Sequence, residues 1–205
     1  MGTGPLPLSE LHPAEHRALR ELHAAGRQLA THWARLAGRL GGAPAAPLRE
    51  GAVRARRLCG ELAEETAKHD LHGFPAAQGA GTQLAGLRNS AGDVILERNQ
   101  ALRLAVLDAE HVATLLRYLA ALADRRDDGA LAAFHRRWAG EIESARDAVR
   151  DAAIALAGDP DDAIGPAERS ALGRAGLGAA SAVGSLGEAF DGSPLGRAAR
   201  RLSGR

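Results

Sequence analysis

Residues 101–123 read ALRLAVLDAEHVATLLRYLAALA, and this stretch decides the fold that the sequence predicts. On a helical wheel at about 100° per residue, most of its polar side chains form one narrow stripe around Glu110. Apolar side chains take the rest of the circumference: Leu102, Leu104, Ala105, Leu107, Ala109, Val112, Leu115, Leu116, Leu119 and Leu122. A helix that is apolar over so much of its surface needs partners on several sides. We therefore expect this helix to be buried nearly all round, inside a bundle of helices.

Three other stretches carry apolar residues at the three-to-four spacing of bundle helices. They predict helices from Ser9 to about Leu40, from about Pro47 to His72, and from Ala130 to Ala157. Glycine pairs and Gly/Pro-containing loops separate the helices, as expected for residues that stop a helix.

The helix around residues 101–123 has start and stop signals of its own. Ser90, with Asp93 three residues later, has the pattern of a capping box, so we expect the helix to begin there. The turn Asp127-Asp128-Gly129 ends it near Arg126. No alternating strand pattern appears in the chain. The fold class is therefore all-α: an antiparallel four-helix bundle with long helices plus an additional C-terminal helix.

The chain divides into three parts. Residues 1–158 are expected to form the four-helix bundle domain. Residues 159–190 are rich in Gly and Ala, and interior glycines cost a helix about 1 kcal/mol each, so this helical segment should form only when packed on the bundle or on a partner. Residues 191–205 are expected to be a flexible basic tail.

Composition excludes several classes of protein. The 205 residues carry a net charge of only +1, which gives no general attraction to nucleic acid. Cys59 is the single cysteine, so no internal disulfide is possible, and a reducing cytoplasm is the default compartment. No signal peptide and no apolar run long enough for a membrane span is present. The dominance of arginine over Lys68, the single lysine, with abundant Ala and Gly, suggests a bacterial source.

One candidate site is a metal centre inside the bundle. Asp108 and His111 fall opposite the polar stripe, three residues apart, and this pair resembles the carboxylate-x-x-His pairs of di-iron bundles, although ferritin-like proteins carry Glu-x-x-His twice. Facing helices offer further possible ligands of a transition metal ion: Glu65, His69, His72, His135 and Glu141. The alternative is that Asp108 and His111 pair with each other or with an arginine of a neighbouring helix.

A second candidate is a phosphorylated histidine. His69 is followed by Leu71 at +2, His72 at +3, Gly73 at +4 and Gly79 at +10. This pattern resembles the motif of histidine-phosphotransfer domains, which are four-helix bundles with an exposed phosphoryl-carrying histidine. The resemblance implies phosphoryl transfer through His69, with His72 in place of the family's lysine. The alternative is a helix C-terminus, where the dipole favours histidine and a glycine ends the helix.

The remaining candidates predict structural roles. The histidines of the first helix flank its seam and should be half-exposed: His12, His16, His23 and His32. Cys59 should lie on the seam of the second helix as an inert thiol. No convincing catalytic set is present, and no cofactor is implied. We therefore expect a helical-bundle protein that acts by interaction, as a scaffold, adaptor or regulator, with a protein partner or by self-association, and without nucleic acid.

Overall fold

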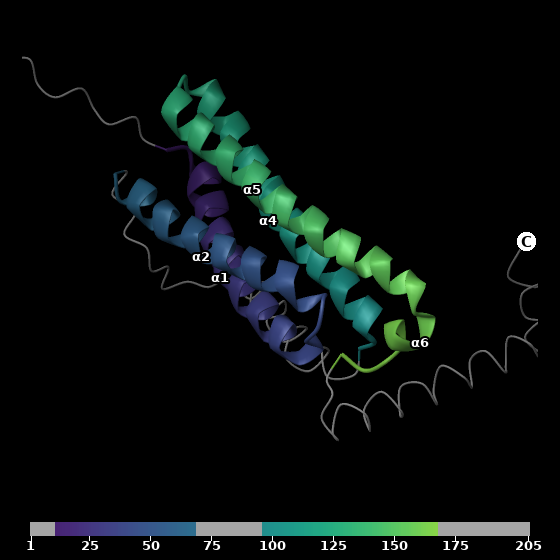
Figure 1. Ribbon diagram of the computed structural model, residues 1–205. Coiled ribbons are helices and arrows are strands. Elements are labelled where there is room, and N and C mark those ends of the chain that lie inside the picture. The colour runs from purple at the N-terminus through teal and green to yellow at the C-terminus, as the bar shows by residue number, and fades with distance from the viewer. Residues whose placement is uncertain (1–10, 69–95, 168–205) are drawn as a thin grey trace, which may run out of the picture.

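The computed structural model describes residues 11–68 and 96–167, and these form an all-α bundle (Figure 1). Its long helices are α1 (Pro13–Leu40), α2 (Ala45–Ala67), α4 (Arg98–Arg125) and α5 (Gly129–Ala155), followed by the short 3₁₀ turn η2 (Leu156–Gly158) and the short helix α6 (Pro160–Ala163). The predicted fold class is confirmed.

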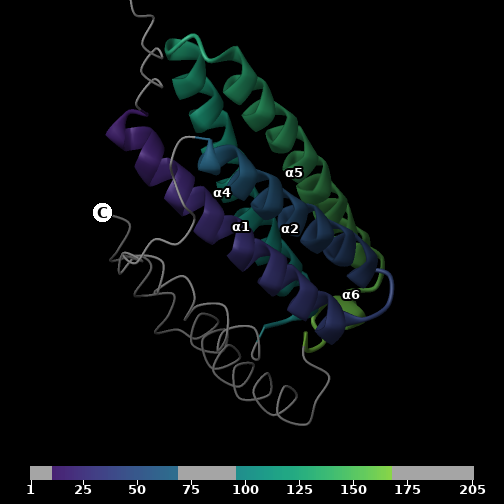
Figure 2. The ribbon, with the colours of Figure 1, turned by 90° about the vertical axis from the view of Figure 1, so that its left-hand side faces the viewer.

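The four long helices occupy the corners of a square. The hairpin α1–α2 lies beside the hairpin α4–α5, with α1 against α4 and α2 against α5 (Figures 1 and 2). Each of these neighbouring pairs is antiparallel, whereas α2 and α4 lie at opposite corners and run in the same direction. Each long helix therefore has two close neighbours and keeps one outward face.

The apolar side chains of the core are aliphatic except for two tryptophans. Trp33 of α1 and Trp138 of α5 are fully buried among leucines and alanines. The Trp33 indole N–H donates to the carbonyl oxygen of Ala105, 3.3 Å away on α4. On the other side, the ring lies directly against Gly51 of α2, where a Cβ atom would overlap it. A glycine at position 51 is therefore what lets α2 approach the indole.

The first helix begins at a different cap from the one predicted. Ser9 lies outside the described residues, and α1 starts at Pro13 with His12 as its N-cap. The backbone N–H of Ala14 donates to His12 Nδ1 (3.1 Å), and the N–H of His12 donates to Glu15 Oε2 (2.9 Å). Glu15 is buried, and its other oxygen lies 3.2 Å from Nε of Arg126, after the end of α4. This ion pair joins the start of α1 to the α4–α5 turn.

The expectation that the α4 helix begins at Ser90 is wrong for its described part. Residues 96 and 97 are not helical, and α4 begins at Arg98 with a capping box between Glu97 and Gln100. The reason is a long-range backbone pairing. The N–H of Arg98 donates to the carbonyl of Gly165 (2.9 Å), and the N–H of Ala167 donates to the carbonyl of Leu96 (3.0 Å).

Arg98 also ties this end of the bundle together. Its buried guanidinium donates to the carbonyl oxygen of Leu40 (3.1 Å), at the C-terminus of α1, and lies 3.2 Å from Oδ2 of Asp162 in α6. The positive side chain thereby meets the negative end of a helix dipole and a carboxylate together. The predicted helical segment 159–190 is described only to residue 167, where it contains α6; its remainder and the tail 191–205 lie outside the described residues.

Candidate functional site

Asp108 and His111 do not share a site. Asp108 Oδ2 lies 2.7 Å from Nδ1 of His32 on α1, and the side chain of His32 is only 3% exposed. His111 is 53% exposed, and its Nε2 lies 3.3 Å from Oε1 of Glu21. The expectation that both side chains point into the bundle is therefore correct only for Asp108, which is half-buried. Three residues turn a helix by about 300°, and this places His111 on the outer side of the α1–α4 contact.

The sequence pattern gave His32 the wrong environment. We expected it half-exposed at the edge of the first seam, yet it is buried and bonded to Asp108. The sequence feature that could have predicted this pair is Asp108 itself, a carboxylate opposite the polar stripe of an otherwise apolar helix. Such a carboxylate needs a polar partner on a neighbouring helix. The imidazole Nε2 is buried as well, so the pair meets solvent only through Asp108, whose side chain is 31% exposed. Its arrangement supports a structural bond between α1 and α4.

The other metal-ligand candidates are dispersed over the bundle. Glu65 pairs with Lys68 at 2.5 Å, and Glu141 lies 3.7 Å from Arg54. Within residues 11–68 and 96–167, no group of three His, Cys, Asp or Glu side chains is placed to hold a metal ion. His69 and His72 lie outside the described residues, so the metal centre that includes them, and phosphoryl transfer through His69, stay predictions.

His135 is the most unusual polar group of the core. It is completely buried on α5, and neither ring nitrogen has a hydrogen-bond partner among the described residues. The nearest aromatic neighbour is Phe134, whose ring lies edge-on at 5.3 Å between centroids. Burial lowers the pKa of His135 to about 4, opposed by the negative charges of Glu65 and Asp128. The imidazole is therefore neutral at pH 7.

The single thiol is partly buried between α1 and α2. Burial raises the pKa of Cys59 to about 11, although the charge of Arg27 opposes this shift. The thiolate form is required for nucleophilic attack and for metal binding. The raised pKa keeps Cys59 in the thiol form at pH 7, and its inertness stays a prediction.

The arginine-rich surface is compensated by neighbouring carboxylates. Arg137 donates to Glu61 Oε2 at 2.6 Å, and the same oxygen accepts the indole N–H of Trp138 at 3.0 Å. The hydrogen bond from Arg137 is the main reason why the pKa of Glu61 lies below its ordinary value. Arg57 and Arg137 also lie over the ring of Trp138, with their guanidinium carbons 5.9 and 5.0 Å from its centroid. These cations cover the indole rather than forming an open basic patch.

The helix that decides the fold is not buried nearly all round. Leu104, Leu107 and Tyr118 of α4 are exposed, and Leu107 reaches 62%. We call these three residues the outer face of α4. Only α1 and α5 pack closely against this helix among the described long helices, so the remaining side faces away from the core. The prediction of near-complete burial is therefore wrong, although the inward residues of α4 are buried as expected.

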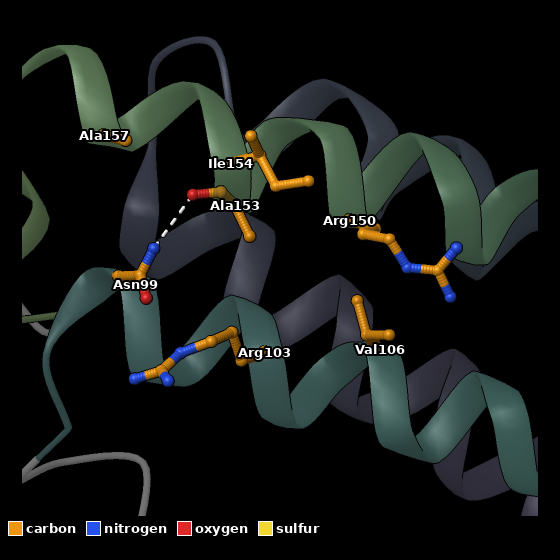
Figure 3. A pocket seen from close by; sticks show the side chains of 7 residues that line it. All are labelled: Asn99, Arg103, Val106, Arg150, Ala153, Ile154 and Ala157. Atoms are coloured by element: carbon orange, nitrogen blue, oxygen red, sulfur yellow. Dashed lines mark hydrogen bonds between the residues drawn. The ribbon is translucent and has the colours of Figure 1, made fainter.

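A groove lies between α4 and α5 near the start of α4 (Figure 3). Its volume is about 460 Å³, and we call it the α4–α5 groove. It is lined by Asn99, Arg103, Val106, Arg150, Ala153, Ile154 and Ala157. Nothing in the sequence pattern indicated it, because its two walls come from helices whose register is fixed only in the folded bundle.

Comparison of the chain with protein-family models, with curated proteins and with solved structures finds no match. Among the described helices, none combines the length and the hydropathy that crossing a bilayer requires.

Proposed function

We propose that this protein acts by binding a protein partner, as a scaffold, adaptor or regulator, and not by catalysing a reaction. The observation that carries the proposal is the outer face of α4. Leu104, Leu107 and Tyr118 are large apolar or aromatic side chains on the exposed side of one helix. Large apolar side chains exposed along one side of a helix are a common feature of surfaces that bind another protein.

The partner that fits this surface is an amphipathic helix. From Leu104 to Tyr118 the outer face extends about 21 Å along α4, at 1.5 Å per residue. A helix of about four turns would cover that length with residues at i, i+3, i+4 and i+7. The straight helical surface offers no free strand edge, so an extended peptide would find no backbone partners on it.

The charges beside the outer face indicate an uncharged contact surface on that partner. On the α5 side, Arg117 lies 2.5 Å from Glu143, and Arg146 pairs with Glu110. On the α1 side, Glu21 already pairs with His111. Because these charges are satisfied within the chain, they neither attract nor repel a partner strongly. Nucleic acid is the less suitable occupant, since it requires a row of uncompensated cations.

Binding to a designed helix tests the proposal. The probe is a fluorescein-labelled amphipathic peptide of about 21 residues, with leucine at the a and d positions of its heptads and alanine, lysine and glutamate elsewhere. We expect saturable anisotropy with the full-length chain, and an affinity reduced at least about tenfold by Leu107→Glu, which places a charge in the contact. Val53→Glu is the matched control, because Val53 is a similarly exposed side chain, at 51%, on α2.

Two outcomes would contradict the proposal. If the wild-type chain does not bind the peptide, the outer face of α4 is not a helix-binding surface. If Leu107→Glu and Val53→Glu reduce the affinity equally, the peptide binds non-specifically. Sedimentation velocity separates a further case: dimerisation that Leu107→Glu abolishes would assign the outer face to a second copy of this chain instead.

A further inference from the structure

The α4–α5 groove has an apolar floor. Val106 of α4 and Ala153, Ile154 and Ala157 of α5 line it, and Ile154 is 64% exposed although it is a large aliphatic side chain. Figure 3 shows Val106 projecting from α4 toward α5, with Ile154 on the α5 side of the groove. Covering this floor with an apolar group removes it from water, which favours binding.

The polar groups of the groove are basic. Arg103 and Arg150 stand at its two ends with their guanidinium groups pointing away from one another, and no acidic side chain lines it (Figure 3). Arg150 is engaged with Asp147, 2.6 Å away on its own helix. Arg103 forms no ion pair with any residue in the described part of the chain.

Asn99 holds the groove in shape. Its side-chain amide donates to the carbonyl oxygen of Ala153 at 2.9 Å (Figure 3). This carbonyl lies in the last turn of α5, just before the chain tightens into η2, where helix carbonyls lack their usual partners. The bond therefore fixes the C-terminal end of α5 against the start of α4, so both walls are in place before any ligand arrives.

We propose that the α4–α5 groove binds a small amphiphilic anion: a molecule with an aliphatic body and one phosphate or carboxylate group. The aliphatic body lies on Val106 and Ile154, and the anionic group lies at Arg103. The volume of the groove falls in the range of small-molecule sites, about 300–1,000 Å³. Arginine is suited to this role because its planar guanidinium donates two parallel hydrogen bonds to a phosphate or a carboxylate.

The test uses the full-length chain and octyl phosphate as the probe, observed through the backbone amide signals of residues 103–106 and 153–157 in ¹H–¹⁵N spectra. We expect octyl phosphate to shift these signals saturably, with an affinity at least about tenfold higher than that of octanol or inorganic phosphate. Octanol lacks the anionic group, and inorganic phosphate lacks the aliphatic body. Octanoate is expected to shift the same signals.

Matched variants separate the two halves of the site. Arg103→Gln is expected to reduce octyl phosphate affinity about tenfold, the value of one charge-assisted hydrogen-bonded pair, and Ile154→Ser to reduce it several-fold. Arg56→Gln and Val53→Ser are the controls, because both residues are exposed on α2, away from the groove. The control variants are expected to bind as the wild-type chain does.

Three results would overturn the proposal. The first is no saturable shift with octyl phosphate or octanoate. The second is equal binding of octanol and octyl phosphate with no effect of Arg103→Gln. The third is co-sedimentation with phosphatidic acid vesicles that Arg103→Gln and Ile154→Ser leave unchanged, with no shift of the groove signals. That result would show that the chain binds anionic lipid through a surface other than the groove.

Discussion

Replacing His135 with leucine should change how the stability of this protein depends on pH. The pKa of His135 is lowered from 6.5 to about 4 in the folded chain, mainly by burial. In the unfolded chain the imidazole is solvated and regains its ordinary pKa. The difference of roughly 2.5 units corresponds to about 3 kcal/mol at 1.36 kcal/mol per unit.

The sign follows from which state binds the proton. Above pH 6.5 the ring is neutral in both states and contributes no pH dependence. Between pH 6.5 and about 4 the unfolded chain binds a proton that the folded chain does not, so stability falls as the pH falls, by up to about 3 kcal/mol. Below that window both states are protonated, and the contribution is constant. Leucine removes this loss, so the variant should keep more stability at pH 4.5 than the wild-type chain.

Leucine should also help at neutral pH. Neither buried ring nitrogen of His135 has a hydrogen-bond partner within residues 11–68 and 96–167, and an unsatisfied buried polar group costs about 1–3 kcal/mol. We therefore expect His135→Leu to raise the free energy of unfolding by about 1 kcal/mol at pH 7.5, and the gap between variant and wild type to widen toward pH 4.5.

Urea unfolding at several pH values measures both effects, with the fluorescence of buried Trp33 and Trp138 as the signal. His23→Leu is a graded control, because the pKa of His23 is also lowered, by burial and by Arg27, but that ring is less buried. It should reduce the acid-side loss less than His135→Leu does. If His135→Leu leaves the difference in stability between pH 7.5 and pH 4.5 unchanged, the buried, neutral state of His135 is wrong.

Two further predictions concern packing and charge. Gly51→Ala should lower the free energy of unfolding by about 1–3 kcal/mol, because its methyl group would overlap the Trp33 ring. The control Gly60→Ala meets no neighbouring atom and should raise the free energy of unfolding by up to about 1 kcal/mol. Equal effects of the two substitutions in thermal unfolding would contradict this packing. Arg126→Ala should lower the free energy of unfolding by about 3 kcal/mol, because it removes the ion pair of the buried Glu15 carboxylate. Adding Glu15→Gln to this variant should recover part of that loss of stability. If the double variant is as unstable as Arg126→Ala alone, the ion pair does not stabilise the fold.

The apolar spacing of the sequence determined the helices and most of their inward faces. In α5, Leu131, Trp138, Ile142 and Val149 are buried as their spacing predicts, because periodicity is a local property of the chain. The α1–α2 turn was equally readable. Gly41 and Gly42 have φ values of 59° and 61°, which residues other than glycine rarely adopt.

Only the tertiary structure decided which polar groups meet and which apolar groups stay exposed. The bond between His32 and Asp108 joins residues 76 positions apart, and it depends on the register of α1 against α4. Leu107 faces outward because only two long helices pack closely against α4 in the described part of the chain. The number of neighbouring helices cannot be predicted from the helical wheel of α4 alone. The start of α4 at Arg98 depends on backbone pairing with Gly165, from the far end of the described chain. Spacing along one helix fixes the angle between its side chains, whereas the partner at each angle is fixed only when the helices pack.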